Sequence, residues 1–101
     1  ESVAHLYDPW HPAVMQLLAT VIGACRARGK GVSVCGEMAG DVAFTDALLA
    51  MGLRSFSMHP SQIAFVKQRI LRADASKLAA QLPQLLGDED PERVAKRLGW
   101  A

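Results

Sequence analysis

The sequence has few of the features that would point at once to a class of protein. It contains only two cysteines in 101 residues, Cys25 and Cys35, with nine residues between them. Disulfide frameworks and paired metal-binding motifs call for other spacings. We therefore expect two free thiols and a reducing, cytoplasmic setting.

Long runs of one kind of residue are also missing. The 11 basic residues are scattered among 10 acidic ones, which argues against nucleic acid or an acidic membrane surface as a partner. No apolar run approaches the ~20 residues of a membrane span, and no charged-then-apolar leader is recognisable. The chain starts at Glu1 instead of methionine, so we expect a processed or excised piece.

Helical periodicity is what the sequence does have. From His11 to Arg28, apolar residues recur at steps of three and four, which is typical of one face of a helix. Pro12 suits the first turn, and Gly29 supplies a stop. The expected apolar stripe consists of Val14, Leu17, Leu18, Val21, Ile22 and Cys25.

Further helices are expected after Asp41, Pro60 and Asp74, each of which is a typical starting residue. Pro83 lies inside the last of these patterns and is expected to kink or shorten it. A short final helix is expected to begin at Pro91.

Two short strands are predicted between the helices, over residues 32–35 and 54–58. The alternation of helix and strand is typical of parallel α/β proteins. Two parallel strands are too few to form a stable sheet, because such strands need neighbours on both edges. The strands therefore belong to a larger sheet, or copies of the chain associate to complete one.

Candidate site residues gather where the predicted strands end. Cys35 ends the first strand, at the edge where parallel sheets carry their chemistry, although a cysteine there can also be a small buried hydrophobe. Gly36 and Gly40 permit a sharp turn or close approach to a ligand. Glu37 orients the loop, meets a cation or is solvated. His59 is either a neighbour of the substrate or a helix cap.

Other reactive side chains have structural interpretations. Cys25 is expected in the core, and Met51 and Met58 are expected to fill gaps in it. His5 and His11 flank a turn-rich segment and are expected to serve packing or turns.

Three blocks of sequence carry a family resemblance: HLYDPWHPAV (5–14), VCGEMAGD (34–41) and GLRSFSMHPSQI (52–63). In order and spacing they resemble the carboxyl end of the phosphoenolpyruvate-utilising enzymes, and the branch they match best is enzyme I of the bacterial phosphotransferase system. The resemblance covers residues 2–73 and continues more loosely to residue 86. We therefore assign residues 1–86 to the phosphoenolpyruvate-binding domain and residues 87–101 to a tail with a short helix.

The resemblance implies an α/β fold in which this chain supplies the last βα units of a (β/α)8 (TIM) barrel. It also implies phosphoenolpyruvate and Mg²⁺ at the carboxyl face of the barrel, a phosphoryl-accepting histidine in a separate amino-terminal domain, the phosphocarrier protein HPr as partner, and a homodimer. The metal ligands and phosphate-binding arginines of the family would precede Glu1. No metal ligand is therefore assigned here, and the chain alone is expected to be inactive.

Within this resemblance only Cys35 matches a functional residue of the family, as the proton donor to C3 of enolpyruvate. Gly36, Glu37 and His59 are expected from their positions to be substrate-binding residues. A free thiol is mostly protonated at neutral pH yet close enough to donate, and we expect apolar burial to keep it neutral. The alternatives are a non-catalytic dimerisation or interaction module, a dikinase- or synthase-type enzyme, and a redox thiol protein. A redox thiol protein would typically carry a Cys-x-x-Cys pair, which this sequence lacks. The sequence does not separate sugar transport from the nitrogen-related branch.

Overall fold

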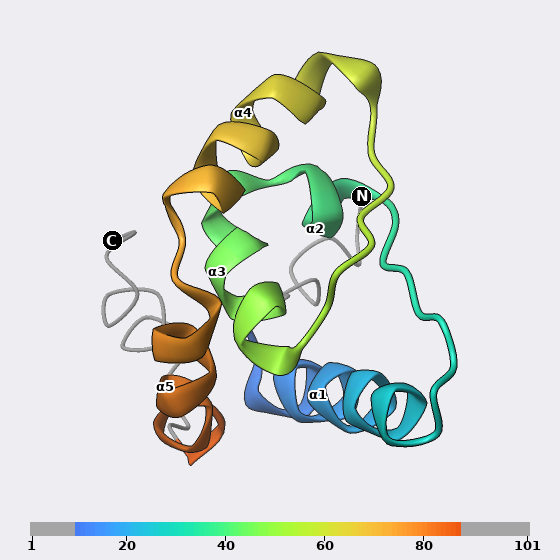
Figure 1. Cartoon of the computed structure of the whole chain (residues 1–101), viewed down its shortest axis with the longest axis vertical. Coiled ribbons are helices and arrows are strands. Elements are labelled where there is room, and N and C mark those ends of the chain that lie inside the picture. Colours follow the sequence, from blue (N-terminus) through green and yellow to red (C-terminus); the bar gives the residue numbers. More distant parts are fainter. Residues whose placement is uncertain (1–9, 88–101) are drawn as a thin grey trace, which may run out of the picture.

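The computed structural model describes residues 10–87, which form five helices around one core (Figure 1). Four of them confirm the helices predicted from periodicity and caps, and the short α2 was not predicted. The helix expected from Pro91, and His5, lie outside the described residues. The helices are α1 (Pro12–Ala27), α2 (Glu37–Gly40), α3 (Val42–Met51), α4 (Pro60–Arg72) and α5 (Ala75–Gly87).

Helix α3 lies at the centre, between α1, α4 and α5 (Figure 1). Every residue from Phe44 to Met51 is buried, including Met51 as predicted. Phe44 also stacks on Trp10, with ring centroids 4.3 Å apart. A helix that is buried all round needs neighbours on every side, and the other helices provide them. The core consists of Met15, Ile22, Phe44, Ala47, Leu48, Met51, Leu53 and Leu85.

The predicted caps hold. Asp41 Oδ1 accepts from the Ala43 N–H at 2.9 Å, and Asp74 Oδ1 accepts from the N–H groups of Ser76 and Lys77. Each bond satisfies a helix N–H that would otherwise lack a partner. His11 plays the same part at α1, where its Nδ1 accepts from the Ala13 N–H at 3.1 Å.

The apolar stripe predicted on α1 is only partly covered. Ile22 is buried, whereas Leu17 and Val21 are 66% and 48% exposed. Cys25 is half-buried instead of lying in the core, which corrects its prediction. No element within residues 10–87 covers these two residues, so this part of the helix's apolar face is left open.

Pro83 does not shorten α5, which was one of the two effects expected of it. The helix continues through it to Gly87. Proline removes one helical hydrogen bond and crowds the preceding turn, but Leu85 beyond it is buried in the core. Packing of this last turn therefore outweighs the local cost of the proline.

The two predicted strands are reduced to a single parallel bridge between Val34 and Phe56. The Val34 N–H donates to the Ser55 carbonyl at 3.3 Å, and the Ser57 N–H donates to the Val34 carbonyl at 2.9 Å. Within residues 10–87 there is no regular strand, so the strand predictions over 32–35 and 54–58 are corrected. Two parallel segments without further neighbours have no partners for a longer ladder.

An ion pair joins α4 to α3. The Arg69 guanidinium donates from Nε and Nη2 to the two carboxylate oxygens of Asp46, at 3.1 and 2.6 Å. The hydrogen bond to Asp46 raises the pKa of Arg69. The charge of Asp46, a residue only 8% exposed, is thereby compensated inside a buried and largely apolar helix. None of the helices in this part of the chain has the length and apolarity needed to cross a bilayer.

Candidate functional site

The bridged segments have two faces of different character. Val32, Val34 and Phe56 are half-buried and pack against the core. The residues that alternate with them are exposed and carry small polar side chains. They are Ser33, Cys35, Ser55 and Ser57. Side chains of extended segments alternate between faces, so the polar set lies on the side away from the core.

A hollow of about 380 Å³ lies at the carboxyl end of these segments. It brings together the three predicted neighbours of Cys35, which come from the start of α2 and the start of α4. Its lining consists of Gly36, Glu37, Ser57, Met58, His59 and Gln62. Cys35 directly precedes this lining in the chain, so the predicted residues share one place in the fold.

The Cys35 side chain is exposed, which corrects the expectation of apolar burial. Gly36, the next residue, turns the chain into α2 with φ +83° and ψ −162°. Only glycine adopts this conformation readily, and a Cβ there would meet nothing within 4 Å. Gly36 therefore serves the sharp turn that directly follows Cys35, and Gly36 itself lines the hollow.

Gly40 serves packing. A Cβ at this position would collide with the side chain of Gln62 on α4 and approach Met58. The glycine thus lets α2 and α4 approach closely behind the hollow. Met58 is half-buried against this turn.

His59 caps α4, which is one of the two roles predicted for it. Its Nδ1 accepts from the Ser61 N–H at 3.2 Å and lies 2.8 Å from Ser61 Oγ. A nitrogen that accepts a hydrogen bond carries no proton, so the proton of the neutral ring is on Nε2. The Nε2–H takes no part in the helix cap. His59 is exposed and lines the hollow.

Glu37 lies in the first turn of α2 with an exposed side chain. It lines the hollow beside His59 and also a neighbouring one formed with Val42 and Phe65. No group of three or more His, Cys, Asp or Glu side chains within residues 10–87 is arranged to hold a metal ion. These residues therefore do not fit a magnesium site by themselves.

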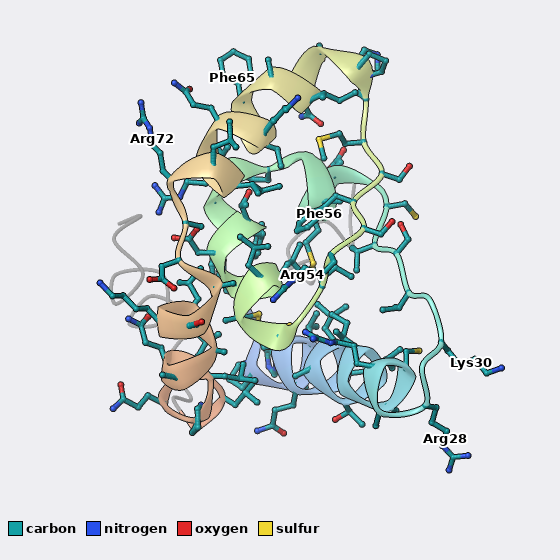
Figure 2. The ribbon with its side chains drawn as sticks, in the orientation of Figure 1. Arg28, Lys30, Arg54, Phe56, Phe65 and Arg72 are labelled. Atoms are coloured by element: carbon teal, nitrogen blue, oxygen red, sulfur yellow. The ribbon has the colours of Figure 1, made fainter. Side chains whose placement is uncertain are left out.

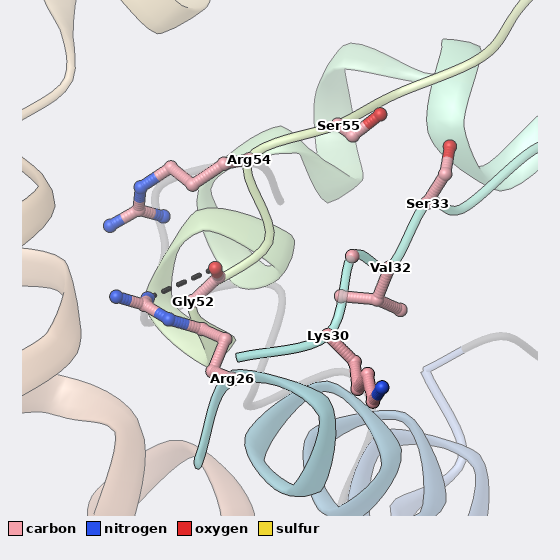
Figure 3. A pocket seen from close by; sticks show the side chains of 8 residues that line it. Arg26, Lys30, Val32, Ser33, Gly52, Arg54 and Ser55 are labelled. Carbon is pink, nitrogen blue, oxygen red and sulfur yellow. Dashed lines mark hydrogen bonds between the residues drawn. The ribbon is translucent and has the colours of Figure 1, made fainter. Parts of the chain in front are cut away.

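A second hollow, of about 550 Å³, lies at the amino end of the same segments (Figure 3). Two of its cationic side chains bind backbone carbonyls where α3 ends. Arg26 Nη1 donates to the Gly52 carbonyl at 3.0 Å, the bond drawn in Figure 3, and Arg54 Nη1 donates to Leu49 and Leu53 at 3.2 and 2.8 Å. These bonds of Arg54 could not be predicted from the sequence, because backbone acceptors leave no pattern in it.

Comparison with known proteins decides what this arrangement belongs to. Residues 1–75 match the family model described as "PEP-utilising enzyme, PEP-binding domain". The chain belongs to this family.

Among curated relatives, the phosphoenolpyruvate-protein phosphotransferase of Cupriavidus necator is 53% identical over 96% of this chain. The proteins of the same name from Enterococcus faecalis and Listeria monocytogenes are 39% and 36% identical over 89% and 95% of it. The chain spans 16–17% of the length of these relatives. The expected family resemblance is therefore confirmed, and the relatives favour the phosphotransferase branch over the dikinases and synthases.

The family match is consistent with a segment of a (β/α)8 barrel. The single parallel bridge has the orientation that such a barrel requires, but the barrel remains a prediction. The family model ends at residue 75, whereas α5 continues to Gly87 and packs against α3.

Proposed function

We propose that this chain is the carboxyl-end part of the phosphoenolpyruvate-binding domain of a phosphoenolpyruvate–protein phosphotransferase, and that Cys35 protonates C3 of enolpyruvate. The observation that carries the proposal is the position of Cys35. It lies at the carboxyl end of a parallel bridge and beside a hollow, within a chain whose relatives carry that enzyme's name. In α/β enzymes this end of the strands carries the chemistry.

The reaction divides into two transfers. The bond between the phosphoryl group and the enol oxygen breaks, and a histidine in a separate amino-terminal domain takes the phosphoryl group. The enolate of pyruvate remains. Its C3 takes a proton from the Cys35 sulfur while C2 regains a carbonyl bond, which gives the methyl group of pyruvate. Water then returns a proton to the thiolate, and the exposure of Cys35 gives water access.

The neighbours of Cys35 have distinct parts in this proposal. Gly36 leaves space at the rim of the hollow, because it carries no side chain there. His59 presents its Nε2–H, a donor suited to an anionic substrate. Glu37 orients the loop at the start of α2. Magnesium and its ligands belong to parts of the protein outside this chain, as does the contact with HPr, so no step is derived for them here.

The decisive experiment replaces Cys35 with alanine or serine in the full-length protein. A positioned general acid contributes about 10²- to 10⁴-fold to a rate, so pyruvate formation should slow by about that factor. Folding should be nearly unchanged, because the side chain is exposed. Cys25→Ala is the matched control, since that thiol lies on α1, away from the hollow. Turnover at the wild-type rate by Cys35→Ala would refute the role.

We also propose that this part of the protein forms a homodimer. Large apolar side chains remain exposed on α1 and α4. They are Leu17, Val21, Ile63, Phe65 and Leu71, and Figure 2 shows Phe65 on the outer side of α4. Open apolar surface favours association. Sedimentation of the full-length protein as a monomer at micromolar concentration would exclude the dimer and leave the catalytic proposal untouched.

A further inference from the structure

The register of the bridge places Ser57 beside Cys35. The two hydrogen bonds of Val34, to Ser55 and from Ser57, make Phe56 its partner across the bridge. Parallel segments advance together, so this register sets the next residues, Cys35 and Ser57, opposite each other. Neighbouring strands are generally about 4.7–4.9 Å apart. Both side chains are exposed.

The face of the bridge supports this pairing. Val34 and Phe56 pack against the core, so Cys35 and Ser57, which follow them, belong to the opposite face. Ser57 also lines the hollow together with Gly36. The Ser57 hydroxyl is thus on the same face as the thiol, and Ser57 lines the hollow. A motif centred on the cysteine does not identify this residue.

We propose that the Ser57 hydroxyl positions the Cys35 thiol and stabilises the thiolate that proton donation leaves. This inference rests on the proposed function. A serine hydroxyl both donates and accepts hydrogen bonds, whereas sulfur does each weakly. When the Cys35 proton moves to C3, the electron pair of the S–H bond stays on sulfur, and an O–H donor beside it favours that charged form. Ser57 acts through Cys35 and is therefore a positioning residue.

The test compares variants of the full-length protein in two measurements. One is the steady-state rate of pyruvate formation. The other is the pH profile of Cys35 alkylation by iodoacetamide, read by mass spectrometry on the peptide that contains Cys35. Ser57→Ala removes the hydroxyl, and Ser57→Thr keeps it. Ser55→Ala is the matched control, because Ser55 lies on the same face and segment but pairs with Ser33 in this register.

Ser57→Ala should slow pyruvate formation about threefold to tenfold with KM unchanged, which is the usual net effect of one hydrogen bond. Its alkylation profile should move to higher pH by about half a unit to one unit, because the thiolate has lost a donor. Ser57→Thr should restore both, and Ser55→Ala should change neither. Glu37 and His59 are the titratable groups around the hollow and are the same in every variant, so a difference between profiles reports on position 57.

An unmoved alkylation profile in Ser57→Ala overturns the inference, even if turnover falls, because a merely structural effect would leave the thiol unchanged. An equal shift in Ser55→Ala overturns it as well. If Ser57→Ala fails to fold, Ser57→Val against Ser57→Thr decides, since the two side chains differ mainly by the hydroxyl. A shifted profile together with wild-type turnover by Cys35→Ala would leave the Ser57 contact standing and refute the proposed function instead.

Discussion

The two ends of the bridged segments use their polar side chains differently. At the amino end, Arg26 and Arg54 donate to backbone carbonyls where α3 ends. At the carboxyl end, Cys35 and Ser57 are small and exposed beside a hollow. The arginine bonds add charged donors to carbonyls at the negative end of a buried helix. The amino end therefore stabilises the fold, whereas the carboxyl end keeps reactive groups accessible.

The sharpest test of this contrast compares two glycines, one at each end. Gly52 has φ +102°, and a Cβ there would lie 2.5 Å from Arg26 Nη1. Gly52→Ala should lower the free energy of unfolding by about 2–3 kcal/mol. Alanine is strained in the left-handed backbone conformation, and its Cβ would displace Arg26 from its hydrogen bond. Gly36→Ala should lower turnover of the full-length protein about tenfold or more through a redirected loop, with a stability loss of only about 1 kcal/mol. Urea titration and pyruvate formation measure the two effects.

The opposite results would contradict this division of roles between the two ends. If Gly52→Ala reduced turnover more than stability, the amino end would belong to the active site. If Gly36→Ala unfolded the protein without a specific effect on turnover, the turn at Gly36 would be structural.

The second prediction concerns the arginines. Arg26→Met and Arg54→Met should each cost about 1 kcal/mol of stability, because each removes hydrogen bonds from a charged donor at a helix end. Turnover of the folded enzyme should stay unchanged. Lys30→Met is the matched control. Lys30 lines the same hollow but extends into solvent (Figure 2), and its loss should stay within about 0.5 kcal/mol. Equal losses for all three variants in urea titrations would show that surface charge, not the bonds to α3, is responsible.

The sequence predicted the helices because their signals are local. Periodic apolar residues and caps such as Asp41 act within a few residues of the elements they start. The strands over 32–35 and 54–58 could not be predicted with equal success, because a strand is completed by partners distant in sequence. That α5 continues beyond Pro83 could not be predicted for the same reason, since the packing of Leu85 is a tertiary effect.

The candidate site was predictable only where a motif marks it. Cys35, Gly36 and Glu37 are contiguous in a recognisable block, and His59 follows the second segment. Ser57 was missed because its position depends on the register of the bridge. The sequence does hold one signal for Ser57. If side chains alternate along both segments and Val34 and Phe56 point inward, then Ser57 and Cys35 both point outward and follow paired residues.

The smallest expected effect separates the two roles of His59. His59→Asn keeps a side-chain acceptor for the Ser61 N–H, because asparagine caps helices well, but it lacks the imidazole Nε2–H. It should raise KM for phosphoenolpyruvate severalfold while stability stays within about 0.5 kcal/mol. His59→Ala, the companion variant, loses the cap as well and should cost about 0.5–1 kcal/mol more. An unchanged KM in both variants would reduce His59 to a helix cap, and the carboxyl end would then rely on Cys35 and Ser57 without it.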